Sequence, residues 1–428
     1  MIDSIIGSLS LAKRFPRFAA SAAPAAIRRF FEVAGIPIYR WAVQIWPDES
    51  GRNPYRLRNQ SEMKPFACDV CGCVVYFENT KCLNCGAALA YLPDTGLIAS
   101  VRSSGTDLWQ SGRGLEYRPC LNYRKHDVCN WAVPADDPNL YCISCRLNRI
   151  IPDLSVVGNR TAWAKFEAAK RRLNYTLLNL ELPVISKSED SLYGVSYEFK
   201  ADVPGTSVIT GHAGGVITIN LGEADDAERE RRRLALGEPY RTILGHFRHE
   251  IAHYYWDRFF RDDESLCKFR SVFSDERSDY SGALTTYYQN GAREAWDEEF
   301  ISAYASSHPW EDWAESWAHY LHMTDALETA AGARALFGLP EPDKPSLAIT
   351  GSETFEQMLN AWLPLSYLLN NLNRSLGLPD AYPFVLSSVA IKKLRFVHEC
   401  IVKYTTGLRL SQGWPSAGAG TCIGCTLD

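Results

Sequence analysis

The amino-acid sequence predicts an α+β fold in which small cysteine-rich modules precede a larger mixed domain and a helical region ends the chain. Residues 194–200 and 216–221 alternate apolar and polar side chains, as half-buried strands do. Residues 161–177 and 240–257 instead repeat apolar side chains every three or four positions, which is the period of a helix with one buried face. Two groups of cysteines lie before residue 150, and they place the small modules there.

Length and composition limit the classes of protein to consider. The 428 residues are enough for two or three domains, and a hydrophobic fraction of 46% supports a sizeable core. The formal net charge is only −5, so no general basic field favours nucleic acid as a partner. No apolar run is long enough to span a membrane. Cysteines with metal-ligand spacing and no convincing signal peptide favour a reducing compartment, so we expect a cytoplasmic protein.

The first 60 residues differ from the rest in charge, because they contain nine Lys and Arg against four Asp and Glu. Basic residues there are interleaved with Phe and Ala, so a basic amphipathic segment and a cleaved leader are both conceivable. Asp3 and the scattered serines do not fit a secretory signal. We expect residues 1–60 to form a poorly ordered extension.

The first cysteine group consists of two Cys-x-x-Cys-Gly knuckles, Cys68 with Cys71 and Cys82 with Cys85. Gly72 and Gly86 permit the tight turn that brings both sulfurs of a knuckle to one side. Four thiolates can then close a tetrahedral zinc site, which a segment too small to bury much core needs for its stability. Two disulfides are the alternative, and they fit a reducing compartment poorly. We predict a zinc ribbon at residues 61–95.

The second cysteine group is less regular, because only its last two members form a Cys-x-x-Cys pair. Its members are Cys120, Cys129, Cys142 and Cys145. Residues 121–140 are expected to form loops or a hairpin between the pairs, and His126 is an alternative ligand. We predict a second structural zinc module at residues 96–150, with buried free cysteines as the other interpretation.

A His-Glu-x-x-His run, His249-Glu250-Ile251-Ala252-His253, carries the most specific chemistry in the chain. On a helix the two imidazoles lie one turn apart on one face, where they can hold a single zinc ion. Glu250 beside them can take a proton from a zinc-activated water, as the general base of a hydrolase. Two exposed helical histidines are the alternative. That helix face also carries His246 and Asp257, and burying so many polar groups would be costly without a metal partner.

A catalytic zinc needs a third protein ligand and keeps one position for water. The helix expected from Pro309 onward carries Glu311 and Glu315 four residues apart, where like charges repel unless a cation lies nearby. This pair resembles the gluzincin pattern, which implies that Glu311 binds the metal and that Glu315 orients a ligand histidine. Glu315 itself and Glu276 are the alternative third ligands. A solvated acidic face is the alternative without a metal.

Further residues are candidates for a role in catalysis or in substrate binding. Peptide hydrolysis needs a hydrogen-bond donor for the developing oxyanion, and Tyr304 and His308 are the residues we consider. Asp257, one turn beyond His253, is a candidate hydrogen-bond partner of a metal ligand. Residues 216–221 are a candidate edge strand for pairing with an extended peptide, although an ordinary sheet strand fits the pattern as well.

The domain boundaries follow from breaks in these patterns. Ile151-Pro152-Asp153-Leu154 marks the start of the main catalytic domain, which we place at residues 151–340. A helical region at residues 341–410 follows, with amphipathic helices expected at 358–377 and 385–404. Residues 411–428 are rich in Gly, Ser and Ala and are predicted to be a mobile tail, and we assign no metal to the lone pair Cys422 and Cys425 there.

Taken together, these segments resemble the bacterial zinc-binding metallopeptidases that carry an N-terminal zinc ribbon. The resemblance covers about residues 64–400, and it implies a zincin-like catalytic domain with peptidase activity. The segments that carry it are Cys68-x-x-Cys71 with Cys82-x-x-Cys85, Cys142 to Leu154, Thr210-Gly211-His212, Tyr240 to Trp256, His308 to His322, and Leu376 to Phe384.

We therefore expect a zinc-dependent metallopeptidase with one catalytic and two structural zinc ions, acting on a peptide or protein substrate. The alternative is a binding protein whose ribbons recognise a protein or nucleic acid and whose HExxH zinc is structural or vestigial. A fourth protein ligand such as His246 would favour the binding protein, whereas an open fourth position would favour the enzyme. A protein partner on the ribbons is compatible with both, and no membrane partner is expected.

Overall fold

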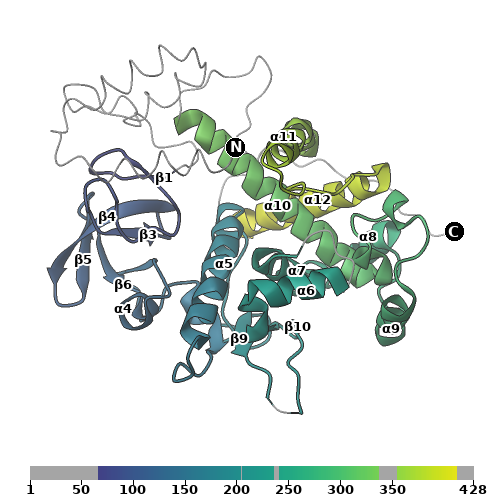
Figure 1. Ribbon diagram of the computed structural model, residues 1–428, viewed down its shortest axis with the longest axis horizontal. Helices are drawn as coiled ribbons and strands as arrows, with labels where there is room; N and C mark the ends of the chain where they lie inside the picture. The colour runs from purple at the N-terminus through teal and green to yellow at the C-terminus, as the bar shows by residue number, and fades with distance from the viewer. Residues whose placement is uncertain (1–65, 204, 236–240, 337–353, 412–428) are drawn as a thin grey trace, which may run out of the picture. The chain divides into compact units, whose positions relative to one another are not determined.

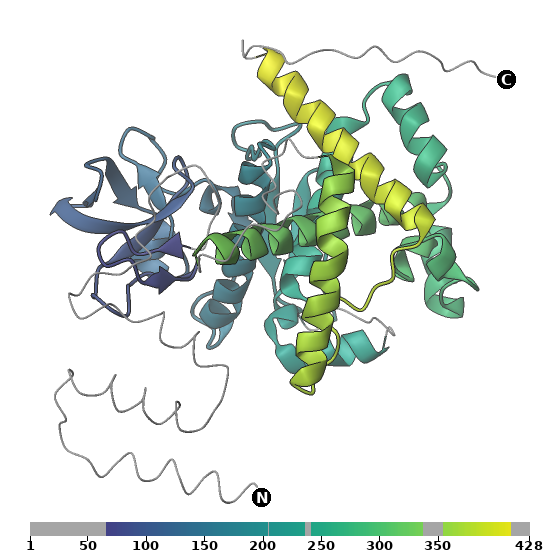
Figure 2. The same cartoon turned by 90° about the horizontal axis from the view of Figure 1, so that it is seen from above.

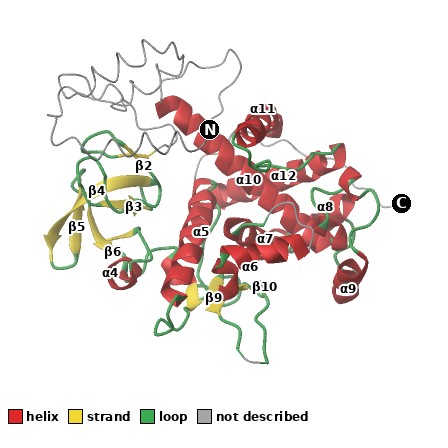
Figure 3. Ribbon diagram, viewed as in Figure 1, coloured by secondary structure: helices red, strands yellow, loops and turns green. Residues whose placement is uncertain are grey.

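The computed structural model describes residues 66–203, 205–235, 241–336 and 354–411. Within these residues the strands concentrate in the N-terminal part and the helices in the remainder, which confirms the α+β class predicted from the sequence (Figure 3). Residues 1–60 of the predicted extension and 412–428 of the predicted tail lie outside the described residues. No helix in the described ranges is long and apolar enough to cross a membrane.

Two sheets build the cysteine-rich region. β1 (Phe66–Ala67) and β2 (Val74–Val75) pair antiparallel on either side of the first knuckle. The second sheet contains five antiparallel strands in chain order, namely β3 (Leu89–Leu92), β4 (Leu97–Gly105), β5 (Leu108–Ser111), β6 (Glu116–Pro119) and β7 (Ala132–Pro134). Its outer strands also approach each other, because the Tyr91 amide donates to the Asn130 carbonyl at 2.9 Å and Tyr91 bridges to Trp131. The sheet therefore curls toward closure, which protects its edges.

The two cysteine groups share this sheet and one core. The boundary predicted between residues 95 and 96 falls in the turn that joins β3 to β4. Cysteines of both groups pack in the same cluster as Phe77, Tyr91 and Trp131. Residues 121–140, expected as loops or a hairpin, contain the short helix α4 (Leu121–His126) and strand β7. The region is thus one folded unit with two cysteine sites rather than two modules in series.

The main domain is built on a mixed sheet with the strand order β10-β11-β9-β8. The strands β8 (Asn148–Ile150), β9 (Ser196–Lys200) and β11 (Val216–Asn220) are parallel, and β10 (Gly211–Ala213) runs antiparallel to β11 at the edge. The expectation that residues 216–221 form the edge strand was therefore wrong. Gly214 and Gly215 adopt positive φ of 53° and 80° in a tight hairpin turn, which folds β10 back along β11 and makes β10 the edge.

Two helices pack on the sheet through aromatic side chains. Helix α5 (Asn159–Asn179) stacks Phe166 on Phe199 of β9, with ring centroids 5.8 Å apart. Helix α7 (Ile243–Phe259) places Phe247 at 5.5 Å from Tyr197 of the same strand. Thr242 begins α7 as its N-cap, because its hydroxyl accepts a hydrogen bond from the Gly245 amide at 3.0 Å. The HExxH run is thereby held on a helix whose other side is buried in the core.

Helix α10 (Pro309–Leu336) begins at Pro309, as the sequence predicts, and lies alongside α7 (Figure 1). Trp313 and Trp317 are fully buried between the two helices. The Trp313 indole donates to the Ala252 carbonyl at 2.9 Å, and Trp317 stacks on Tyr255 at 5.0 Å. Because truncating a buried Trp costs roughly 3–5 kcal/mol, these contacts fix the spacing of α7 and α10 firmly.

The remaining described helices complete the fold. They are η2 (Cys145–Leu147), η3 (Leu221–Ala224), α6 (Asp226–Ala235), α8 (Asp263–Phe273), α9 (Tyr280–Asn290), η4 (Trp296–Glu298), η5 (Tyr304–Ser307), α11 (Phe355–Ser375) and α12 (Ser388–Ser411). α11 and α12 lie against α10 (Figure 2). The described part of the region predicted at 341–410 is thus largely helical, and residues 337–353 lie outside the described ranges.

Candidate metal centres

Helices α7 and α10 bring three donor side chains together. His249 Nε2 lies 2.9 Å from Glu311 Oε2, and His253 Nε2 lies 3.7 Å from Glu311 Oε1. One donor atom from each of the three residues lies within 4.8 Å of the others. Ligands bound to zinc at about 2.0–2.1 Å in a tetrahedron are about 3.4 Å apart, so these side chains match a zinc site without rearrangement.

Burial makes this cluster costly without a cation. Glu311 is 1% exposed and His253 is 3% exposed. Burial alone would raise the pKa of Glu311, but His253 and His249 outweigh it and lower the pKa to about 2. Burial lowers the pKa of His253 to about 3. At neutral pH the pair therefore offers a carboxylate and a neutral imidazole, which are the forms that bind zinc.

Glu315 orients His249. Its Oε1 lies 2.7 Å from His249 Nδ1, and its Oε2 accepts a hydrogen bond from the Ser302 hydroxyl at 2.6 Å. A carboxylate only accepts, so Nδ1 carries a proton and Nε2 is the nitrogen whose lone pair would bind a metal. This is the geometry expected of a residue that positions a ligand histidine.

Replacing Glu315 should weaken the binding of one zinc ion. We expect Glu315→Ala to lower zinc affinity at the HExxH site by roughly 10–100-fold, because His249 loses the contact that sets its tautomer and ring orientation. Glu315→Gln should have a smaller effect, since the amide oxygen can still accept from Nδ1. Chelator competition against Glu298→Ala, an exposed acid of η4, measures the difference. Unchanged affinity in Glu315→Ala would show that Glu315 does not act on the metal.

Glu250 lies beside His249 on the same face of α7 as the two histidines. Its side chain is half-buried. Removal from water raises the pKa of Glu250 to about 7, with His249 opposing the shift and Glu311 adding to it. A carboxylate in such surroundings holds a proton more readily than one in water, which suits a group that accepts and returns protons.

Two tyrosines flank the cluster. Tyr304, a residue predicted from the sequence, has its ring 5.9 Å from the ring of His249. Tyr280 was not singled out, yet its hydroxyl donates to Glu311 Oε1 at 2.7 Å. Tyr280 begins α9, which has no buried residue and which the Asp279 side chain caps. Only the concentration of tyrosines near residues 280–288 could have drawn attention to it.

Three other residues predicted from the sequence, His308, Glu276 and Asp257, do not join the three donors. His308 uses both ring nitrogens, because Nδ1 accepts from the Trp310 amide at 3.1 Å and Nε2 donates to the Ser278 carbonyl at 3.2 Å, so it is not free to stabilise an oxyanion. Glu276 pairs with Arg270. The Asp257 side chain is exposed near the end of α7, and among the described residues it forms no hydrogen bond with His249, His253 or Glu311, so its proposed contact with a metal ligand stays a prediction. His253 is buried at the site, whereas Asp257, one turn later on α7, is exposed at the surface.

His246 does not join the three donors. Its Nδ1 lies 2.5 Å from Glu223 Oε2, and Glu223 is buried beneath α7. Burial alone would raise the pKa of Glu223, but His246 and Thr210 lower it to about 2. Glu223 therefore stays ionised and holds His246 in a contact separate from the three donors.

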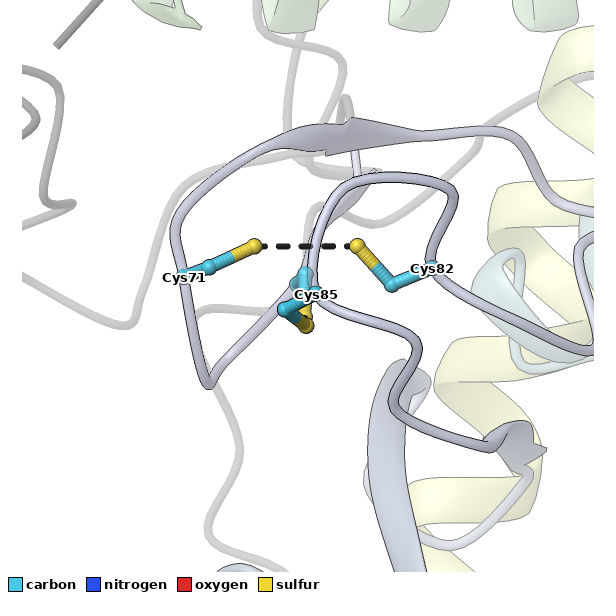
Figure 4. Close-up of side chains that lie close together, drawn as sticks. Cys71, Cys82 and Cys85 are labelled. Atoms are coloured by element: carbon cyan, nitrogen blue, oxygen red, sulfur yellow. Dashed lines mark hydrogen bonds between the residues drawn. The ribbon is translucent and has the colours of Figure 1, made fainter. Parts of the chain in front are cut away.

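The first cysteine group forms a convergent set of four sulfurs. Cys71 and Cys82 face each other with sulfurs 3.6 Å apart, and Cys85 points to the same centre (Figure 4). Cys68 and Cys85 are also 3.6 Å apart. A tetrahedron of about 2.3 Å zinc–sulfur bonds places sulfurs about 3.8 Å apart, whereas a disulfide would hold them at about 2.05 Å. The distances fit zinc and exclude the disulfide alternative.

The knuckle glycines behave as the sequence predicts. Gly72 and Gly86 adopt φ of 73° and 77°, in the left-handed region that side chains disfavour. Their amides donate to the Cys68 and Cys82 carbonyls at 2.7 and 2.9 Å, which closes each turn.

The second cysteine group is equally convergent and entirely buried. Cys129 and Cys142 sulfurs lie 3.7 Å apart, and Cys120 and Cys145 complete the set. Backbone amides support the sulfurs, with the Trp131 amide donating to Cys129 and the Cys142 amide to Cys120, each at 3.4 Å. His126, the alternative ligand, packs its ring on Trp163 instead. The four thiols are a complete donor set for a structural zinc.

Comparison with known proteins agrees with these sites. A family described as "Putative zinc-binding metallo-peptidase" matches residues 159–400, and one described as "zinc-ribbon domain" matches residues 65–156, which include both cysteine groups. Uncharacterized proteins of Mycobacterium bovis (strain ATCC BAA-935 / AF2122/97) and Mycobacterium tuberculosis (strain ATCC 25618 / H37Rv) are each 40% identical over 341 residues, which cover 79% of this chain and 95% of the relative. No solved structure is significantly similar to the chain.

Proposed function

The chain belongs to the zinc-binding metallo-peptidase family, and from this membership we propose that it is a zinc-dependent peptidase that hydrolyses peptide bonds in a peptide or protein substrate. The observation that carries the proposal is the donor set. His249, His253 and Glu311 converge, and among the described residues no fourth His, Cys, Asp or Glu joins them. Catalytic zinc sites have three protein ligands and an open position, whereas structural sites are closed by four.

The alternative of a binding protein with a structural or vestigial zinc at the HExxH run would need a fourth ligand. His246 is the residue of α7 best placed by its helical spacing. Its contact with the buried Glu223 keeps it out of the donor set, and this favours the enzyme.

In the proposed mechanism, His249, His253 and Glu311 would hold a zinc ion, which would supply a Lewis acid for the scissile carbonyl and the attacking water. Glu250 accepts the proton of that water and later delivers it to the leaving amine. Glu315 keeps His249 in the orientation in which Nε2 faces the centre. Tyr280 donates to Glu311 Oε1, and Oε2, the oxygen nearer His249, is buried without a hydrogen-bond donor and would be available to a metal. We assign Tyr304, beside His249, as the donor to the oxyanion.

The cysteine sites are proposed to be structural and to bring the total to three zinc ions per chain. Each has four sulfurs and no donor position left for substrate. A zinc count by mass spectrometry of the intact protein therefore separates the proposal from one in which the HExxH donors bind no metal, for which the count would be two.

Hydrolysis of a proteome-derived peptide library by the full chain tests the proposal. We expect cleavage that stops when a chelator removes the zinc of the HExxH site and returns when zinc is added back. A broad library is needed, because an enzyme with one protein target would leave a general substrate such as casein intact. A protein that holds three zinc ions and cleaves nothing in the library would overturn the assignment as a peptidase.

A further inference from the structure

One face of α5 is both polar and buried, which is unusual for a helix in the middle of a domain. Its members follow the helical period and are Glu167, Lys170, Arg171 and Asn174. All four turn toward the segment that carries the second cysteine group. Asn174 donates to the Ser144 hydroxyl at 2.9 Å, Arg171 donates to the Val128 carbonyl at 2.5 Å, and Glu167 Oε2 lies 3.6 Å from Cys145 Sγ. Buried charges on this face need opposite charges nearby.

Glu167 and Lys170 form a buried ion pair with each other. Lys170 Nζ lies 2.7 Å from Glu167 Oε1, and both side chains are fully buried. The Trp163 indole and the Asn148 amide donate to the same oxygen at 3.0 and 2.8 Å. This pair is neutral as a unit and leaves no net charge to balance Arg171.

Arg171 is a buried cation without a carboxylate partner. It is 5% exposed, and within the described ranges no salt bridge joins its guanidinium to an acid. Burial alone would lower the pKa of Arg171, but Cys129 and Cys145 lead the groups that raise it. Four neutral thiols would not offset a buried guanidinium. Four thiolates around one zinc ion carry a formal charge of −2 and would.

We propose that Cys120, Cys129, Cys142 and Cys145 bind zinc as an anionic tetrathiolate whose counter-ion is Arg171, so that this zinc ties the cysteine-rich unit to helix α5 of the main domain. The next residue of α5, Arg172, has surroundings unlike those of Arg171. Arg172 is half-exposed and pairs with Glu78 at the surface, at 2.6 Å. The first cysteine site likewise reaches the surface, since Cys85 is exposed and Cys71 half-buried.

Helix α5 also contacts α7, the helix that carries the HExxH run, and this links the second zinc to the position of α7. Phe166 of α5 packs its ring 6.4 Å from Phe247 of α7, two residues before His249. Thr176 of α5 and Arg248 of α7 both bond to Asp325 of α10. Loss of the second zinc would leave Arg171 buried without a counter-charge against the helix that supports α7. Zinc at the cysteine site therefore stabilises the fold that positions His249 and His253.

Metal release from the full-length protein tests this inference without reference to peptidase activity. Cobalt substituted for zinc reports thiolate ligation through its charge-transfer absorption, and a chelator in excess gives the release rates. In the wild type we expect two thiolate-bound metals, one released quickly and one slowly. Arg171→Met should lose the slow class or release it at least about tenfold faster, while Arg172→Met should match the wild type.

The release rates can contradict the proposed role of Arg171 in several ways. A slow class that persists in Arg171→Met at the wild-type rate would overturn the proposal, and so would a wild type with only one thiolate-bound metal. If Arg171→Met does not fold, Arg171→Lys is compared with Arg172→Lys. The lysine at 171 keeps the charge but not the reach of the guanidinium, so it should release the slow metal measurably faster than its neighbour; equal rates would contradict the proposed counter-ion. A failure of the peptidase assay leaves all of these measurements unaffected.

Discussion

Glu250→Gln should abolish peptide hydrolysis while the protein keeps three zinc ions per chain. The change replaces the proposed proton acceptor with an amide of nearly the same shape, and none of the three donor residues is altered. Loss of a general base typically lowers the rate by roughly 10²–10⁴-fold. Turnover on a cleaved library peptide, measured together with the zinc count, gives both quantities from one preparation.

Glu264→Gln provides the matched control, because it makes the same chemical change at an exposed position on α8. It should retain wild-type turnover. If Glu250→Gln retained turnover as well, another group would be the base. If it lost zinc, the effect on rate would report metal loss and not proton transfer, and the assignment of Glu250 would have to be withdrawn.

Glu311→Gln should remove one zinc ion of the three and reduce hydrolysis to background. The carboxylate is 1% exposed and lies between both histidines, so it is the negative charge that the site offers to the metal. An amide is a much weaker zinc ligand, and we expect the affinity of this site to fall by at least about 100-fold. The cysteine sites lie on other elements and should keep their two zinc ions.

Asp312→Asn separates loss of a ligand from loss of stability. Asp312 is the next residue of α10, is equally buried, and pairs with Lys393 of α12 at 2.6 Å. Breaking that buried pair should lower the melting temperature but leave three zinc ions in the folded protein. If Asp312→Asn lost the same zinc as Glu311→Gln, the result would indicate local unfolding of α10 instead of a ligand role for Glu311.

The features that could be predicted from the sequence are those whose geometry is set within a few residues. The spacing of His249 and His253 places both rings on one helical face wherever the helix lies. The knuckles of the first cysteine group turn because glycine tolerates positive φ, as Gly72 and Gly86 do. Pro309 begins α10 because proline fits the first turn of a helix and not its interior.

The sequence-based predictions that failed concerned features that depend on which strands pair and which helices pack together. Residues 216–221 read as a strand, but only the Gly214-Gly215 turn decided that β10 and not β11 would form the edge. The boundary at residue 95 cut a hairpin, since β3 is buried at every position and so shows no alternation of apolar and polar side chains that would mark it as a strand paired with β4. Asp257 shares a helical stripe with His249 and His253, but its side chain is exposed near the end of α7.

The sequence alone predicted the donor residues of the three candidate metal sites, because donor type and local spacing decide which metal a motif can hold. It also indicated the α+β class, because side-chain periodicity records which faces are buried. Only the tertiary structure decided which partners reach those motifs. Tyr280 donates to Glu311, and Arg171 donates to the Val128 carbonyl beside Cys129, and both are contacts between distant segments. Such contacts form where packed helices and sheets bring side chains together, and no spacing along the chain encodes that distance.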